Sequence, residues 1–133
     1  MADRPILLTP LRKALASLDA ALAVEHRDDL ARDGAIQRFE YTYELSWKLM
    51  KRHLEWTGTL DTHRLGKKDI FRQAARAGLL TNPERWFAHH EARNESTHAY
   101  DANIAAKVFG NISAFAHDAH ELLDNLARYH AGS

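Results

Sequence analysis

The segment IQRFEYTYELSWKLMKRHLEWTG, residues 36–58, determines which class of fold this chain can adopt. Its apolar side chains recur every three or four residues, the period of one face of an α-helix, at Ile36, Phe39, Tyr43, Trp47, Met50 and Leu54. Upstream, Asp28 and Asp29 provide a cap and an acidic first turn, and Gly58 provides a stop. The sequence therefore predicts one long amphipathic helix over 28–58.

Several side chains of this helix are aromatic and permit two interpretations. Exposed rings stack on nucleic-acid bases, whereas a helical stripe of rings is more often part of a core or a dimer contact. We expect core or dimer contact for Phe39, Tyr43, Trp47 and the adjacent Tyr41.

The helical period continues on both sides of this segment. Prolines occur only at positions 5, 10 and 83, and almost no alternating β-branched run competes with helix. Thr9-Pro10 and Asn82-Pro83 each predict an N-cap followed by a first-turn proline. The other predicted elements are a helix over 10–26, a loop from Thr57 to Gly66, a short helix from Lys67 to Ala77 closed by Gly78, a helix from Pro83, and a last helix carrying the apolar stripe from Ile104 to Tyr129.

These elements predict an all-α fold, an up-and-down antiparallel bundle of four to five helices. A chain of 133 residues is long enough to bury one sizeable core, and no repeat or linker divides it. We therefore expect a single domain over residues 1–133.

The composition restricts the classes of function. The 18 basic and 18 acidic residues give a net charge of zero. The protein as a whole therefore has no net positive charge that would attract DNA or an anionic membrane, and any contact with RNA must be made by a local patch of positive charge. The absence of cysteine excludes disulfides, thiolate metal sites and thiol nucleophiles. No apolar run is long enough for a signal peptide or a membrane helix, so we expect a cytoplasmic protein.

Residues 93–100, RNESTHAY, have a composition that fits neither of the helices beside them. Asn94, Ser96 and Thr97 favour caps and turns, because their short polar side chains compete for backbone hydrogen bonds. On an unbroken helix Arg93 and His98 would point about 140° apart. A helix ending near Asn94 and a new one starting near Thr97 or at residue 101 would instead bring the polar residues together.

An arginine beside a histidine suits the chemistry of a phosphodiester. Guanidinium binds phosphate bidentately, and imidazole exchanges a proton near neutral pH. Metal-free RNA cleavage needs a base for the 2′-hydroxyl and a cation for the phosphate, which His98 and Arg93 would supply. The alternative is an ordinary helix junction in which Arg93 pairs with Glu91 or Glu95 and His98 is solvated.

Three segments resemble a known family in order and spacing: IQRFEYTYELSWKLMKRHLEWTG, KKDIFRQAARAGLL and WFAHHEARNESTHAYD. They are similar to the nucleotidyltransferase substrate-binding proteins of the HEPN superfamily and resemble HepT-like toxins. The superfamily motif is an arginine, a polar residue and then a histidine, here Arg93, Asn94 and His98. HepT-like members add a tyrosine two residues after the histidine, here Tyr100.

The resemblance implies a specific function. It implies a homodimeric HEPN bundle and a ribonuclease toxin that needs no metal and no cofactor, with Arg93, Asn94 and His98 catalytic. It also implies a partner, an MntA-like nucleotidyltransferase antitoxin that transfers AMP to Tyr100. The runner-up is a catalytically silent subunit that binds a substrate or nucleotide for the nucleotidyltransferase. A purely structural bundle would leave the motif as coincidence.

Acidic and histidine pairs outside the motif offer weaker hypotheses. Glu40 and Glu44 lie one helical turn apart, which suits acid–base work or a cation, but a solvated face or a Glu44–Lys48 pair is the simpler interpretation. His117 and His120 are close enough to share a metal, yet no third ligand is fixed. We expect no metal site.

Basic and imidazole groups near the motif are candidates for substrate binding. His89 or His90 would line a cleft between the two motifs of a dimer and hold phosphate there. A surface position is the simpler interpretation for both histidines and for Arg85. Lys67 and Lys68 begin the only compact basic run, which continues through Arg72 and Arg76 with Arg64 just ahead. This run is the best candidate for an RNA-backbone or acidic-partner contact, with a solvated face as the alternative.

Overall fold

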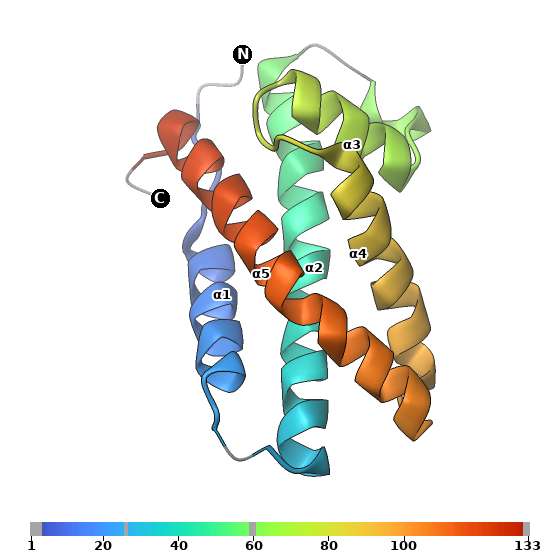
Figure 1. Ribbon diagram of the computed structural model, residues 1–133. Coiled ribbons are helices and arrows are strands. Elements are labelled where there is room, and N and C mark those ends of the chain that lie inside the picture. Colours follow the sequence, from blue (N-terminus) through green and yellow to red (C-terminus); the bar gives the residue numbers. More distant parts are fainter. Residues whose placement is uncertain (1–3, 26, 59–60, 132–133) are drawn as a thin grey trace.

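The computed structural model describes residues 4–25, 27–58 and 61–131, and every regular element in these ranges is helical (Figure 1). The elements are α1 (Thr9–Leu22), α2 (Asp29–Thr57), the 3-10 turn η1 (Thr62–Arg64), α3 (Lys67–Arg76), α4 (Pro83–Glu95), the 3-10 turn η2 (Ser96–His98) and α5 (Ala102–Tyr129). The predicted all-α fold is confirmed.

The four longer helices alternate in direction, and α2 is the central one (Figure 1). α1 and α4 lie on either side of α2, while α5 crosses it obliquely and α3 packs at the end of the bundle where α2 stops. Within the described residues, no helix combines the length and the apolar character that crossing a bilayer requires. The predicted up-and-down bundle is confirmed.

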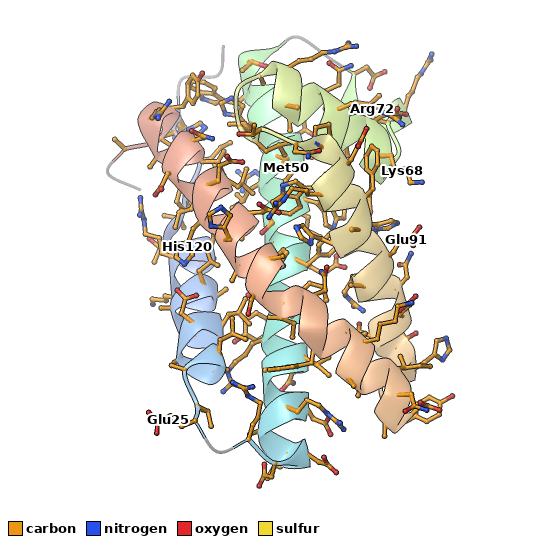
Figure 2. The ribbon with its side chains drawn as sticks, viewed as in Figure 1. Glu25, Met50, Lys68, Arg72, Glu91 and His120 are labelled. Atoms are coloured by element: carbon orange, nitrogen blue, oxygen red, sulfur yellow. The ribbon has the colours of Figure 1, made fainter. Side chains whose placement is uncertain are left out.

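The core forms around the aromatic stripe of α2. Phe39 and Tyr43 are fully buried, and Phe39 meets Phe115 of α5 edge to face, with ring centroids 5.0 Å apart. Met50, further along α2 (Figure 2), is also fully buried. The stripe is therefore core, as expected, except at Trp47, which is half-buried, and at Tyr41, which is 41% exposed.

The helix ends follow most of the capping signals in the sequence. The Asp28 carboxylate accepts the Ala31 N–H at 2.8 Å, and Asn82 accepts the Glu84 N–H at 3.0 Å. Gly58 and Gly78 adopt left-handed φ values of 70° and 79°, which stop α2 and α3. A side chain with a Cβ would be strained at either glycine.

Two predicted boundaries are wrong. Thr9 is the first helical residue of α1 and not its N-cap, because the cap position belongs to Leu8, which has no capping side chain. α1 also ends at Leu22, not at residue 26. The Arg27 guanidinium donates to the carbonyls of Leu22 and Val24, each at 3.1 Å, and so satisfies the end of the helix from outside. The predicted loop after α2 also contains the η1 turn.

The far end of the bundle is closed by two buried histidines. The His130 Nδ1 atom accepts the Ile6 N–H at 3.0 Å, and its Nε2 atom lies 2.9 Å from Nδ1 of His53. The Trp56 ring packs against both imidazoles. This contact ties the segment before α1 to the ends of α2 and α5.

Candidate functional site

The polar residues of RNESTHAY end one helix, and Asp101, directly after them, starts the next. α4 ends at Glu95, where Thr97 donates its hydroxyl proton to the Asn94 carbonyl at 3.0 Å. The Asp101 carboxylate then accepts the N–H groups of Asn103 and Ile104, at 2.9 and 3.1 Å, and caps α5. The predicted helix junction is therefore present.

Arg93 points inward, toward α2. Its Nη1 atom donates to Glu40 Oε2 and to Ser96 Oγ, both at 3.1 Å, and its Nε atom lies 3.5 Å from Glu44 Oε1. Ser96 Oγ in turn lies 2.7 Å from the same Glu40 oxygen. Arg93, Glu40, Glu44 and Ser96 thus form one charged cluster, which we call the Arg93 cluster.

The Arg93 cluster corrects two simpler interpretations. Arg93 does not pair with Glu91 or Glu95, and Glu95 pairs with Lys107 of α5 at 3.0 Å. Glu40 and Glu44 do not form a solvated face, because the Arg93 guanidinium of α4 pairs with both carboxylates. These pairings join residues about 50 positions apart, which helical spacing cannot predict.

His98 and Tyr100 lie on the outside of the same junction. Both side chains are exposed, Tyr100 by 87%, and their ring centroids are 6.2 Å apart at a steep angle. Within the described residues no hydrogen bond or ion pair links His98 to Arg93. The structure places the motif residues at one junction, with the arginine facing the bundle and the histidine facing outward.

Asn94 connects the junction to His90. The Asn94 amide nitrogen lies 3.4 Å from His90 Nε2, and His90 Nδ1 lies 2.8 Å from the Tyr43 hydroxyl. Burial lowers the pKa of His90, and the Lys67 and Lys68 charges lower it further. His90 is therefore a half-buried group that links α4 to Tyr43 of α2, rather than a fully exposed one.

His89 belongs to a buried network that holds α4 against α5. Its Nε2 atom lies 2.6 Å from Asp118 Oδ2, and Asn111 donates to its Nδ1 at 3.1 Å, so the imidazole proton sits on Nε2. Arg85 donates to the same Asp118 oxygen at 2.9 Å, and this hydrogen bond raises the pKa of Arg85. Burial lowers the pKa of His89 despite the carboxylate.

The surface interpretation is wrong for His89, which is 2% exposed. Arg85 is exposed, as expected, although it is paired with Asp118. Asp118 and Asn111 were not among the residues predicted from the sequence. One signal was present: Asp118 is a carboxylate inside the otherwise apolar stripe of the last helix.

The proposed histidine pair for a metal is divided between two environments. His120 lies 2.7 Å from the Asp19 carboxylate of α1, between α5 and α1 (Figure 2), and His117 is exposed. Over the described ranges, no group of three or more histidine, aspartate or glutamate side chains is arranged to hold a metal ion. Neither histidine contacts the Arg93 cluster.

This chain is similar to several known proteins. The family model described as "Nucleotidyltransferase substrate binding protein like" matches residues 7–128. A curated protein of Haemophilus influenzae named "Probable ribonuclease HepT" is 42% identical over 95 residues. That match covers 70% of this chain and 65% of the relative, so the chain spans slightly less than two thirds of the relative's length.

Two solved structures share the fold over most of both chains. A Haemophilus influenzae protein, described as revealing the fold of a substrate binding domain of a nucleotidyltransferase, superposes with a TM-score of 0.85 at 34% identity, covering 90% of this chain and 98% of the other. A Thermus thermophilus protein superposes with a TM-score of 0.79 at 30% identity, covering 87% and 98%.

Proposed function

This chain belongs to the family of nucleotidyltransferase substrate-binding-like proteins, and from that premise we propose that it is a metal-independent endoribonuclease of the HEPN type. It acts as the toxin of a toxin–antitoxin pair. Its antitoxin is a small nucleotidyltransferase that transfers AMP to Tyr100. The observation that carries the proposal is the junction at 93–100, where an anchored arginine and an exposed histidine and tyrosine occur together.

The chemistry is transfer of a phosphodiester to its neighbouring 2′-hydroxyl. His98, directly or through a water that it positions, accepts the 2′-hydroxyl proton, and the oxygen forms a bond to phosphorus while the bond to the 5′-oxygen breaks. The leaving oxygen takes up a proton, and the products are a 2′,3′-cyclic phosphate and a 5′-hydroxyl. Arg93 stabilises the charge that develops on the phosphate.

The contacts of Arg93 support this role. Glu40 and Ser96 hold Nη1, whereas Nη2 forms no hydrogen bond with any other described residue. Nη1 is therefore fixed by Glu40 and Ser96, and Nη2 is the guanidinium nitrogen left for a phosphate oxygen. Asn94, exposed one turn before His98, presents an amide to the same region.

The exposure of His98 and Tyr100 supports a homodimer and a modifying partner. Neither side chain is covered by the described part of this chain, so a second copy of the junction across a two-fold axis would enclose RNA between two motifs. A tyrosine hydroxyl this exposed is reachable by a second enzyme. AMP on Tyr100 would place a phosphate and a base beside His98, where RNA must bind.

The test is expression of this chain alone beside Arg93→Ala and His98→Ala variants, with growth and RNA integrity as readouts. The unsubstituted chain should cleave RNA in the presence of EDTA and leave a 2′,3′-cyclic phosphate. Each substitution should reduce the rate by about 100-fold or more. Cleavage abolished by EDTA and restored by magnesium would contradict the metal-independent mechanism.

Modification is tested separately with the nucleotidyltransferase and ATP. Mass spectrometry should find AMP on the peptide that contains Tyr100. A Tyr100→Phe variant should retain cleavage, because only one exposed oxygen is removed. It should also remain toxic beside its partner, because the hydroxyl that accepts AMP is gone. AMP on another residue would contradict the assignment of Tyr100.

The alternative is a non-catalytic subunit that binds a substrate or nucleotide for a nucleotidyltransferase. One observation favours it: the positive charge of Arg93 is already matched by two carboxylates, Glu40 and Glu44. The description of the similar Haemophilus influenzae structure points the same way. RNA that stays intact, together with tight binding to an active nucleotidyltransferase, would favour this alternative.

A further inference from the structure

Four cations at the junction of α2, α3 and α4 lie over two aromatic rings. The Nζ atoms of Lys67 and Lys48 are 5.0 and 5.9 Å from the centroid of the Trp47 ring. Over the Phe87 ring lie Lys68 Nζ at 5.5 Å and Arg72 Cζ at 5.0 Å. The faces of the two aromatic rings attract these cations and restrict the positions of the charged groups.

Most of these cations have no acidic partner. Arg72 binds Asp69 at 3.0 Å, but none of the three lysines comes within 4.0 Å of a described carboxylate. Of the nearby carboxylates, Asp69 is engaged by Arg72, and Glu44 by Trp47 and Arg93. Glu91 acts on the pKa of His90 but forms no ion pair with any of the three lysines. Among the described residues the three lysines therefore carry positive charge without an ion-pair partner, in a chain whose net charge is zero.

This surface continues along α4 to the motif. Phe87, His90 and Asn94 lie within about 60° of one another on that helix, over an axial length of about 10 Å. The Lys67 and Lys68 charges reach His90, and the Asn94 amide lies 3.4 Å from its ring. In Figure 2, Lys68 and Arg72 of α3 and Glu91 of α4 lie along the same edge of the molecule. The cations therefore stand in line with Asn94, one turn from His98.

We propose that Lys67, Lys68 and Arg72, set on Trp47 and Phe87, form a track that binds the phosphates of single-stranded RNA on one side of the cleaved bond. The inference rests on the proposed ribonuclease function and assigns how its substrate is held. A positively charged groove that follows the backbone binds a single strand without reading its sequence, and here the two rings hold the cations in place. An acidic protein partner would explain the charges but not their alignment with the motif.

A charge-matched pair of variants tests the track. Lys67→Gln/Lys68→Gln removes two adjacent cations from the track, and Arg12→Gln/Lys13→Gln removes two adjacent exposed cations from α1. Binding of a labelled single-stranded RNA is measured by fluorescence anisotropy at several salt concentrations, in a His98→Ala background so that the RNA survives. Cleavage is measured in the same variants with His98 intact.

The track variant should bind RNA about 10-fold more weakly than the α1 control. Its slope of log affinity against log salt should fall by about 1.4, since each phosphate contact on a single strand contributes about 0.7. In the cleaving protein the KM for RNA should rise while kcat holds. Equal affinities and slopes in the two double variants would overturn the inference.

Two further outcomes separate this inference from its premise. If the unsubstituted chain does not cleave RNA but the track variant still binds RNA more weakly than the control, the ribonuclease proposal fails and the track stands. If RNA affinity is unchanged but the track variant no longer co-elutes with the nucleotidyltransferase, the surface binds that protein and the RNA track is overturned.

Discussion

The two ends of α5 both carry histidines, and they use them in opposite ways. Before its N-terminus His98 is exposed, with the Tyr100 ring as its neighbour. At its C-terminus His130 is fully buried, and both of its ring nitrogens are hydrogen-bonded, one to the Ile6 N–H and one to His53. Residue type is the same at the two ends, and the environment decides what the imidazole can do.

The buried pair is fixed in its neutral form. Because the Ile6 N–H donates to Nδ1 of His130, the His130 proton sits on Nε2 and is donated to His53. Burial lowers the pKa of His53 to about 4, with a smaller effect from His130, and burial lowers that of His130 as well. These histidines stabilise the fold, whereas the ring of His98 is exposed and can be reached by a substrate.

The largest effect should follow from breaking the buried pair. His130→Ala leaves a cavity and removes the partner of both the Ile6 N–H and His53, which should lower the free energy of unfolding by about 3–4 kcal/mol. His117→Ala, on the exposed side of the same helix, is the control and should cost no more than about 0.5 kcal/mol. Urea denaturation measures both, and equal losses would contradict the assignment of His130.

The second effect is a pH dependence of stability. The unfolded chain binds protons on His53 below the ordinary pKa of 6.5, whereas the folded chain does so only below about 4. The stabilisation is therefore complete above pH 6.5, is lost as the pH falls from 6.5 to about 4, and is constant below that. The loss should be about 2–3 kcal/mol.

A His53→Gln variant isolates this contribution, because carboxylates also titrate in the acid part of the range. Its unfolding free energy should vary less between pH 6.5 and 4 than that of the unsubstituted chain. Parallel curves for the two proteins would show that His53 is not the group responsible.

The third effect concerns the Arg93 cluster. Charged side chains pair there, whereas the neutral imidazoles of His53 and His130 pair at the other end of the bundle. Arg93→Ala leaves Glu40 and Glu44 side by side without their cation and should cost about 1–2 kcal/mol, less than a fully buried pair because these side chains are partly exposed. A double-mutant cycle with Glu40→Gln should give a coupling of about 1 kcal/mol. A coupling of zero would mean that the pair contributes nothing to the fold.

The smallest effect should be that of His98→Ala. Its side chain is exposed and makes no hydrogen bond with another described residue, so thermal and urea stability should stay within about 0.5 kcal/mol of the unsubstituted chain. Any loss of RNA cleavage in this variant is then chemical in origin. A large loss of stability would place His98 among the structural histidines and remove the contrast between the two ends.

Helical period and capping residues predicted most of the fold. Asp28, Asn82, Gly58 and Gly78 mark ends that the structure confirms, because a cap acts on backbone groups within the next few residues. The end of α1 was missed because no glycine or proline directly follows Leu22, whose carbonyl is satisfied by the Arg27 side chain from outside the helix.

The candidate site was predictable as a junction and not as a set of contacts. The short polar residues of RNESTHAY indicate where the helix breaks, since Ser96 and Thr97 bond to nearby backbone carbonyls. The partners of Arg93 and His89 belong to other helices. The helical period of a sequence predicts which face of a helix is buried, but not which residue of a neighbouring helix lies against that face. The roles of Arg93, Asn94, His98 and Tyr100 in catalysis and modification stay predictions.

The hydrogen bond between Ile6 and His130 has a consequence for the order of folding. It joins residues 124 positions apart, and closing so long a loop costs more chain entropy than forming any helix pair that is adjacent in sequence. The contact should therefore form after the rate-limiting step, once α1, α2 and α5 have assembled. His130→Ala should then accelerate unfolding and leave the folding rate nearly unchanged. On this view, the histidine end of the bundle sets how long the folded molecule lasts, not how quickly it forms.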